Sequence, residues 1–472
     1  MFPSKPITLA GHDGCETGGW SIAKARLLVD PTPDCSSTAS VRVLRAEYDR
    51  LRSSIRDKVY REGGIIEPSA ILSVKFREEN KIKQAMKSVI LLSLLVGPSL
   101  CLAAASNAYL DWKSFNAVGA NLGGWLVQES TMDTAWWAQY SGGAVDEWGL
   151  CAHQGSQCGP VLERRYATWI TTADIDILGA AGVNVLRIPT TYAAWVEVPG
   201  SQLYHGNQQA FLASMSSYAI NKFGMHIIID IHSLPGGVNG FPFGEADGHY
   251  GWFNNQTALK YSLEAVDAAI SFIQNSNSPQ SYTLAPINEP VDVEDLSLFG
   301  TPYCLTDSGA TYLANYMHQV IAKVEAINSK IPIMFQGSFK GEAYWSANFT
   351  DDTNLVFDIH NYYFEGRSAS PSNVTQLICA DAVNSAGDGK FPTFVGEWSI
   401  QTQIANTFAS RAKILETGLA AWKKYTRGSA YWTTKFTGNT TVDGEGTQMD
   451  YWNYETFINL GYTKSTSAAV SC

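Results

Sequence analysis

The sequence predicts an α/β protein that folds as a (β/α)8 barrel, the TIM-barrel architecture. Strand-like and helix-like segments alternate eight times between residues 117 and 436. Most of the strand-like segments are continuous apolar runs, as expected for parallel strands that are covered on both faces. An open, doubly wound sheet is the alternative. No Gly-x-Gly-x-x-Gly sequence follows the first strand, so the barrel is favoured.

The expected strands and helices follow one another along the chain. The strands are 117–125, 183–190, 226–232, 282–289, 331–338, 355–362, 393–399 and 429–436. Between the strands lie amphipathic stretches that predict helices, such as 172–181, 208–223, 257–274, 309–328 and 407–425. From residue 107 to the end there is no linker, repeat or low-complexity run. We therefore expect one domain over residues 106–472.

Residues 86–105 have the pattern of a secretory signal peptide: a basic start at Met86, an apolar run and three alanines. The segment follows 85 residues without a clear hydrophobic period, and two explanations stay open. Either translation starts at Met86, and residues 1–85 are a disordered or spurious upstream extension, or the segment is a type II membrane anchor. A membrane span needs about 20 apolar residues, and this run is shorter. We favour the signal peptide and an extracellular or cell-wall location.

Sequons and cysteines agree with export. Acceptors for N-glycosylation occur at Asn255, Asn348, Asn373 and Asn439. Five cysteines follow the signal segment. In an oxidising compartment Cys151–Cys158 is the easiest local bridge and Cys304–Cys379 is a second candidate, although sequence alone does not give the connectivity.

The charge of the chain disfavours nucleic acid as a partner. Residues 1–85 hold 14 Lys and Arg against 11 Asp and Glu, whereas residues 86–472 hold 19 against 33. Phosphate binding needs a basic face, so this acidic body fits a neutral or polymeric substrate better. The sequence contains no Cys-x-x-Cys, His-rich or nucleotide-binding pattern. We expect no metal, no cofactor and no stable membrane partner, and we expect a monomer.

Polar residues gather where the predicted strands end. In a (β/α)8 barrel the carboxyl ends of the strands meet at one rim, where the βα loops carry the reactive groups. Each residue alone has a structural explanation, such as an ion pair or core packing. A whole set at one rim is harder to explain, because buried charges are rarely unpaired. The set is Asn121, Glu129, Arg187, Asp230, His232, Asn288, Glu289, His360, Tyr362, Glu397 and Trp432.

Two carboxylates, Glu289 and Glu397, end strands four and seven across this rim. Cleavage of an acetal needs a proton donor for the leaving oxygen and a second carboxylate at the anomeric carbon. When the carboxyl groups lie about 5–5.5 Å apart, the second one attacks directly and the configuration is retained. Arg187 is expected to keep one carboxylate ionised, and Asn288 is placed to bond the sugar 2-hydroxyl. The pair predicts a glycosidase, which is retaining if the two carboxyl groups lie that close together.

Six blocks of sequence resemble glycoside hydrolase family five, particularly its fungal exo-β-1,3-glucanase branch. They are "GANLGGWLVQES", "VLRIPTTY", "IIIDIHSLPGGVNG", "APINEP", "FDIHNYY" and "FVGEWS", in the family's order over roughly residues 115–436. The resemblance implies that Glu289 is the general acid/base and Glu397 the nucleophile, and that Glu129 binds the sugar. It also implies that the cleaved-sugar subsite is lined by Arg187, His232, Asn288, His360, Tyr362 and Trp432.

The sequence departs from the family's pattern in three places. Ser233 stands where the family has Gly after the third-strand His. In the block "NGFPFGE", Asn239 and Phe241 persist as substrate-binding candidates, but the following polar residues are replaced. The aromatic expected three places after Tyr362 is displaced to Phe364. These loops shape the subsite beyond the scissile bond, so the linkage and the exo or endo mode stay open.

The expected function is that of a secreted β-glucanase that releases glucose from β-1,3-glucan. A β-1,6-glucanase of the same family is the alternative, because "DEWGLC" (146–151) is similar to that branch. A non-catalytic wall-binding protein is a further alternative, although a decayed enzyme usually loses a carboxylate and both are present. Aromatic side chains in the predicted βα loops are candidates for stacking on sugar rings. They are Trp136, Trp137, Trp252 and Phe253.

Overall fold

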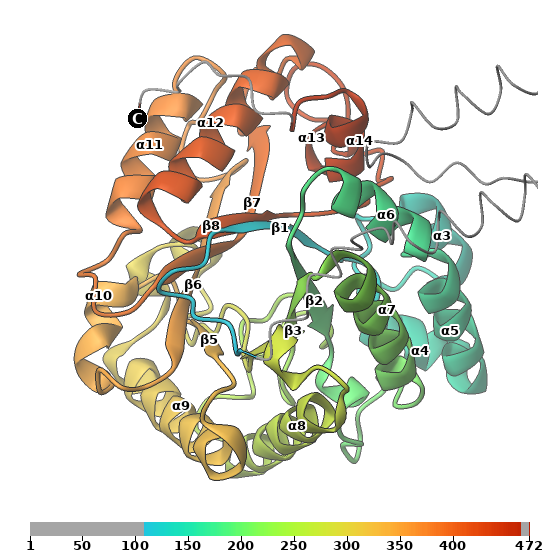
Figure 1. The fold of residues 1–472 in the computed structure, drawn as a ribbon. Helices are drawn as coiled ribbons and strands as arrows, with labels where there is room; N and C mark the ends of the chain where they lie inside the picture. Colours follow the sequence, from blue (N-terminus) through green and yellow to red (C-terminus); the bar gives the residue numbers. More distant parts are fainter. Residues whose placement is uncertain (1–107, 464–471) are drawn as a thin grey trace, which may run out of the picture. The chain divides into compact units, whose positions relative to one another are not determined.

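Eight parallel strands form a closed barrel in which each strand pairs with the next and β1 pairs with β8 (Figure 1). The computed structural model describes residues 108–463 and residue 472. Every strand overlaps a predicted one, which confirms the (β/α)8 fold. The strands are β1 (Ala117–Asn121), β2 (Val185–Thr190), β3 (His226–Ile231), β4 (Tyr282–Ala285), β5 (Ile333–Gln336), β6 (Leu355–Tyr363), β7 (Thr393–Thr402) and β8 (Gly428–Tyr431).

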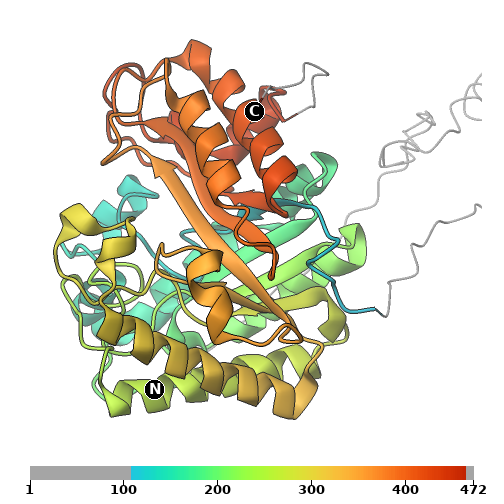
Figure 2. The ribbon, with the colours of Figure 1, turned by 90° about the vertical axis from the view of Figure 1, so that its left-hand side faces the viewer.

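Helices surround the barrel (Figures 1 and 2). The five predicted helices are present as α6 (Thr172–Ala180), α7 (Gln208–Phe223), α8 (Gln256–Asn275), α9 (Asp307–Asn328) and α12 (Arg411–Tyr425). The helix α7 ends at Gly224, whose φ of 66° suits a residue without a Cβ. The remaining helices are α3 (Thr134–Tyr140), α4 (Glu147–Gln154), α5 (Cys158–Thr168), α10 (Glu342–Trp345), α11 (Val374–Asn384), α13 (Met449–Trp452) and α14 (Tyr454–Asn459).

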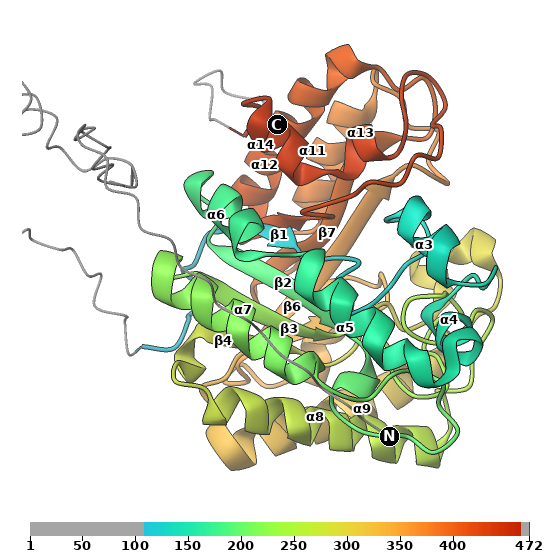
Figure 3. The same ribbon diagram turned by 90° about the vertical axis from the view of Figure 1, so that its right-hand side faces the viewer.

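The long connection after β1 carries α3, α4 and α5 outside the barrel, where α5 lies beside α7 (Figure 3). No helix was predicted there, because the segment is rich in Gly and polar residues. The fourth strand is shorter than predicted. Its ladder ends at Ala285, since Pro286 has no N–H to donate and Glu289 adopts a positive φ of 46° that a strand does not allow.

The core has two layers. An inner cluster fills the amino-terminal end of the barrel with one apolar side chain from each strand, capped by Trp112. The Trp112 ring nitrogen donates a hydrogen bond to Thr283 Oγ1 (3.0 Å), which closes that end. A larger cluster lies between the strands and the helices. With one end of the barrel sealed, the opposite end is free to carry the site.

Two disulfides lie in this domain. Cys151–Cys158 forms as predicted. Cys379 pairs with Cys472 instead of Cys304, so the second candidate bridge is wrong. Cys304 is a buried free thiol whose sulfur lies 3.5 Å from the Ser338 hydroxyl. In the part of the chain that the structure describes, no helix is long and apolar enough to cross a membrane. The predicted signal peptide and upstream extension lie outside the described residues.

Candidate active site

The inward side of the strands changes from apolar to polar along their length. Val185 and Ile228 belong to the inner apolar cluster. Two residues further along their strands, on the same face, are Arg187 and Asp230. Both polar side chains are fully buried. Since buried charges require partners, the carboxyl end of the barrel must hold a compensated charge network.

Glu289 and Glu397 lie side by side in this network. Carboxylate oxygens of the two residues approach within 4.8 Å of each other. Both side chains are buried, with 5 % and 4 % exposure. The spacing matches retaining glycosidases, where the carboxyl groups are about 5–5.5 Å apart, and not inverting ones, where a water separates them. The two carboxylates therefore lie close together, as the sequence predicts.

Glu289 is held by its backbone as well as its side chain. Its positive φ is uncommon for a residue with a side chain. Asn239 Nδ2 donates to the Glu289 carbonyl oxygen at 3.2 Å, which fixes this turn. The Glu289 carboxylate lies 2.7 Å from His360 Nδ1. Strained backbone of this kind persists where the surroundings hold it and often marks a functional site.

Glu397 is oriented by two donors. Arg187 Nη1 donates to one carboxylate oxygen at 2.7 Å, and the Tyr362 hydroxyl donates to the other at 2.9 Å. A register shift between β6 and β7 sets His360 opposite Glu397. The arrangement suits a nucleophile that must be negative and fixed in direction.

Arg187 connects most of the site. Its guanidinium contacts Asp230 at 3.1 Å and Asp358 at 3.5 Å, in addition to Glu397. Its Nη2 also donates to Asn288 Oδ1 at 2.8 Å. Burial alone lowers the pKa of Arg187, but Asp230, Glu397 and Asp358 raise it above its usual value. A permanently charged Arg187 therefore holds Asn288 and Glu397 in one geometry.

His360 is surrounded by carboxylates. Besides Glu289, it faces Asp358 through Nε2 (3.3 Å) and Glu397 through Nδ1 (3.6 Å). Burial lowers its pKa, but the charges of Glu397 and Asp358 raise it to about 10. The ring is consequently protonated near neutral pH and has no lone pair for a metal ion. Glu289, His360 and Glu397 are close enough to surround a cation, but their charges favour acid–base chemistry.

His232 and Trp432 form one wall of the site. Their rings stack with centroids 5.7 Å apart and planes inclined by 15°. His232 Nδ1 lies 2.6 Å from Asp230 Oδ2, and this contact raises the pKa of His232 against the opposing effect of burial. Asn288 Nδ2 lies 3.4 Å from the other ring nitrogen. These contacts orient polar atoms toward the space beside the two glutamates.

Glu129 belongs to the same electrostatic cluster. Burial raises its pKa to about 8; the charge of His232 opposes this shift, while Glu397 and Glu289 add to it. Below that pH the carboxyl is neutral and can both donate and accept hydrogen bonds. Such a group suits a sugar hydroxyl better than a charged ligand.

A row of phenylalanines leads away from Glu289. Phe241 stacks on Phe243 (5.3 Å, 16°) and packs edge-on against Phe299 (4.5 Å). Phe299 contacts Phe339 at 5.0 Å. All four are only partly buried. Phe241 N donates to Asn239 Oδ1 (3.1 Å), and Asn239 in turn bonds Glu289, so this partly exposed apolar surface begins beside Glu289.

The structure brings all predicted site residues to one end of the barrel, but not all predicted rim aromatics. Trp252 is fully buried, with its ring nitrogen bonded to Ser262 (3.0 Å), so its prediction as a rim residue is wrong. Trp137 is also largely buried, and Trp136 packs on Arg165 (4.9 Å). Sequence reasoning missed Asp358 and Trp452, which stacks on Tyr362 (5.5 Å). The "FDIHNYY" block contains Asp358 at inward spacing, which is the signal that could have found it.

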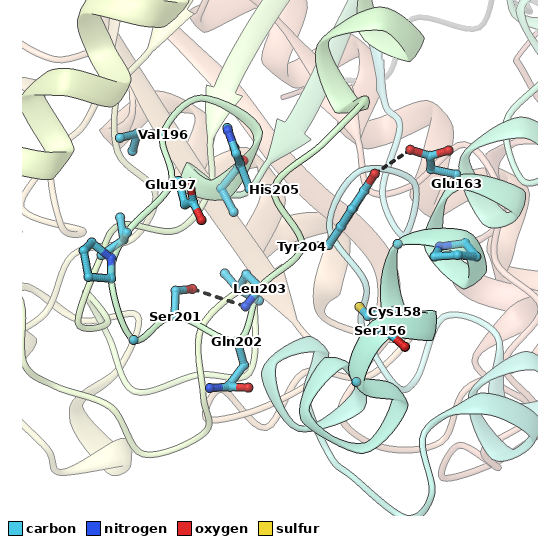
Figure 4. Close-up of a pocket in the computed structure, with 17 residues that line it drawn as sticks. Ser156, Cys158, Glu163, Val196, Glu197, Ser201, Gln202, Leu203, Tyr204 and His205 are labelled. Carbon is cyan, nitrogen blue, oxygen red and sulfur yellow. Dashed lines mark hydrogen bonds between the residues drawn. The ribbon is translucent and has the colours of Figure 1, made fainter.

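A separate hollow lies between the start of α5 and the loop after β2 (Figure 4). Tyr204 and Glu163 close one side of it through a hydrogen bond of 2.5 Å. None of the predicted site residues lines this hollow. It does not contribute to the chemistry of the two glutamates.

Comparison with known proteins finds a matching family model and fungal relatives. The family model "Cellulase (glycosyl hydrolase family 5)" matches residues 145–438. "Probable glucan 1,3-beta-glucosidase A" of Aspergillus niger is 28% identical over 330 residues, covering 67% of this chain and 74% of the relative. "Glucan 1,3-beta-glucosidase 1" of Schizosaccharomyces pombe is 26% identical over 307 residues, covering 62% and 70%.

Two solved structures are more similar. The crystal structure of rutinosidase from Aspergillus niger is 57% identical, with a TM-score of 0.75, and the match covers 76% of this chain and 100% of that one. The crystal structure titled AoRut is 60% identical, with a TM-score of 0.74, over 75% and 98% of the two chains.

Proposed function

Because the chain belongs to glycosyl hydrolase family 5, we propose that Glu289 and Glu397 are the catalytic pair of this retaining glycoside hydrolase. Glu289 is the general acid/base and Glu397 the nucleophile. The observation that carries the proposal is the approach of the two carboxylates within 4.8 Å. Glu397 takes the nucleophile role because Arg187 and Tyr362 each donate a hydrogen bond to one of its oxygens and fix its direction.

In the first step, a Glu397 oxygen attacks the anomeric carbon, and the bond from that carbon to the leaving oxygen breaks. Glu289 donates its proton to the leaving oxygen, so the aglycone departs as a neutral alcohol. In the second step, Glu289 removes a proton from water while the water oxygen attacks the anomeric carbon. The ester bond to Glu397 breaks, and the sugar leaves with its original configuration.

The substrate we propose is a small β-glycoside with an aromatic aglycone and a glucose-based sugar, such as a rutinoside. Two observations support this class. The rutinosidase of Aspergillus niger is matched over 100% of its length at 57% identity. In addition, Phe241, Phe243, Phe299 and Phe339 offer flat, partly exposed faces on the leaving-group side, and aromatic rings stack well on such faces.

Hydrolysis of β-1,3-glucan ends, the function expected from the sequence, is the second candidate. The relatives named glucan 1,3-beta-glucosidase favour it, although they are only 26–28% identical to this chain. The sugar-side residues Arg187, Asn288 and Glu129 suit glucose in either case. The two candidates differ in what lies beyond the scissile bond.

Product analysis with four substrates separates the candidates. Rutin, quercetin 3-glucoside, laminarin and pustulan are incubated with equal amounts of enzyme, and the released sugars are resolved by chromatography. We expect intact rutinose from rutin, at a kcat/KM well above that for laminarin. Glucose released from laminarin with rutin left intact would support the glucanase instead, and a ladder from pustulan would support the β-1,6 alternative.

We further propose that the enzyme is exported. The four predicted glycosylation sites, Asn255, Asn348, Asn373 and Asn439, are all exposed, and two disulfides lie in the described domain. Disulfides persist mainly in oxidising compartments. Amino-terminal sequencing of the secreted protein tests this proposal. A mature start near Ser106 is expected, and a protein that stays in the membrane fraction with the leader attached would contradict it.

A further inference from the structure

Two consecutive acids, Asp146 and Glu147, are buried at the start of α4. Their side chains are 6 % and 1 % exposed. They belong to the "DEWGLC" block, and neither touches the proposed catalytic pair. Each carboxylate accepts hydrogen bonds from backbone N–H groups of loops that reach the active site. A carboxylate in such a position fixes the backbone of the loop that donates to it, because buried backbone N–H groups need hydrogen-bond partners.

Glu147 acts on the loop that presents Glu129. Its carboxylate accepts a hydrogen bond from the backbone N–H of Gln128 at 2.7 Å. The neighbouring Glu129 pairs with Asp146 in an isolated antiparallel bridge. Gln128 is itself buried, and its side chain donates to the Trp125 carbonyl oxygen at 2.6 Å. The backbone of Gln128 and Glu129 is therefore tied to the start of α4.

Asp146 acts on the loop that carries the phenylalanines. One carboxylate oxygen caps α4 by accepting from Gly149 N (2.6 Å), and the other accepts from Asp247 N (2.8 Å). Asp247 lies at the closing end of a loop in which Gly248 N donates to Gly240 O at 2.8 Å. Phe241 and Phe243 lie within that loop. The Asp146 side chain thus fixes the position of this loop relative to α4. Beside it, Trp148 packs on His249 (5.6 Å).

We propose that Asp146 and Glu147 are positioning residues that hold the sugar-binding wall and the aglycone-binding wall of the cleft at a fixed separation. Glu147 sets the sugar side through Glu129, and Asp146 sets the aglycone side through the loop of Phe241 and Phe243. The inference rests on the proposed function, which assigns the sugar to Glu129 and the aglycone to the phenylalanines. It adds that the "DEWGLC" block determines substrate preference without touching the substrate.

Steady-state kinetics of four variants with two substrates tests this division of roles. β-Glucosyl fluoride has no aglycone ring, whereas 4-nitrophenyl β-glucoside has one. Glu147→Leu removes the acceptor for Gln128 N, and its matched control Glu147→Gln keeps one. Asp146→Asn keeps one acceptor oxygen and remains a good helix cap, so that the bond to Asp247 is lost. Glu129→Gln tests the sugar side directly.

A buried donor that loses its only acceptor is strongly disfavoured, which sets the direction of the expected changes. For Glu147→Leu we expect KM to rise by about tenfold for both substrates, with the Gln control within about twofold of wild type. For Asp146→Asn we expect KM to rise by about fivefold for the nitrophenyl glucoside and to stay unchanged for the fluoride. The thermal midpoint of each variant is measured alongside.

A rise in KM for one substrate but not for the other supports a positioning role. A purely structural role would change the KM values of both substrates in parallel. Equal changes with both substrates in Asp146→Asn, or unchanged KM values with a lowered thermal midpoint, would overturn the inference. If Glu129→Gln raises KM for the fluoride but Glu147→Leu does not, the positioning role fails and the proposed function stands. If Glu129→Gln has no effect, the assignment of the sugar to Glu129 fails, and the inference fails with it.

Discussion

The buried carboxyl of Glu147 makes the stability of the enzyme depend on pH, and the substitution Glu147→Gln should remove that dependence. Burial raises the pKa of Glu147 from 4.5 to about 8 in the folded protein. A group whose pKa is raised on folding binds its proton more tightly in the native state. Its contribution to stability is complete below the unfolded pKa and is lost as the pH rises through the folded pKa.

The pKa difference sets the magnitude. One pKa unit corresponds to about 1.4 kcal/mol, so a shift of about 3.5 units changes the free energy of unfolding by at most about 5 kcal/mol. The loss develops between pH 4.5 and about 8. Glutamine is neutral throughout and keeps an acceptor for Gln128 N. Glu129 also has a raised pKa, of about 8, but it is present in both proteins and cancels in the difference.

The measurement is urea unfolding of the wild type and Glu147→Gln at pH values from 5 to 9, with Glu264→Gln as the control. Glu264 is exposed on α8 and pairs only loosely with Lys260 (3.7 Å). We expect the variant to gain several kcal/mol on the wild type as the pH rises, and the control curve to run parallel to the wild type. Parallel curves for Glu147→Gln would refute the argument that this carboxyl is buried and protonated.

Three further substitutions test separate parts of the structure. Glu397→Ala should lower kcat by several orders of magnitude, as expected for loss of a catalytic group. Azide should restore turnover by a single displacement that yields the α-glycosyl azide; wild-type rates without azide would remove Glu397 from the nucleophile role. Phe241→Ala should raise the KM for aryl glucosides by about tenfold through loss of stacking and leave the KM for β-glucosyl fluoride unchanged. An equal rise in KM for both substrates would place Phe241 outside the aglycone site. Cys472→Ser removes the disulfide that closes a loop of 93 residues, and it should lower the free energy of unfolding by about 2–4 kcal/mol. The measurement is urea unfolding. An unchanged unfolding midpoint would mean that the bridge to Cys379 does not form.

Much of the barrel could be predicted because its strands are short apolar runs separated by amphipathic helices. The location of the candidate site could be predicted from the same pattern, since polar residues lie where the apolar runs end. The position of Glu289 could not be predicted in detail. Its block reads as a continuation of β4, and only the contacts of Asn239 and His360 reveal the turn that lifts it out of the strand.

Other features depend on contacts that sequence spacing does not show. Trp252 looked like a rim aromatic, but Ser262 of α8 offers its ring nitrogen a partner inside the core. Cys379 finds its partner at residue 472 through the return of the chain to α11, which a count of cysteines does not give. The row from Phe241 to Phe339 joins three separate loops. The resemblance to exo-β-1,3-glucanases predicts a glucan, whereas this row, which the sequence does not reveal, supports the proposed aromatic aglycone.

In the proposed mechanism Glu397 forms a covalent bond to the sugar, while Glu289 donates and accepts the proton. The most direct measurement is to trap the intermediate with 2-deoxy-2-fluoro-β-glucosyl fluoride, digest the inactivated enzyme and locate the added sugar by mass spectrometry. We expect one fluoroglucosyl group on the peptide that contains Glu397. A label on another residue, or a product that forms with inverted configuration and no trapped enzyme, would contradict it.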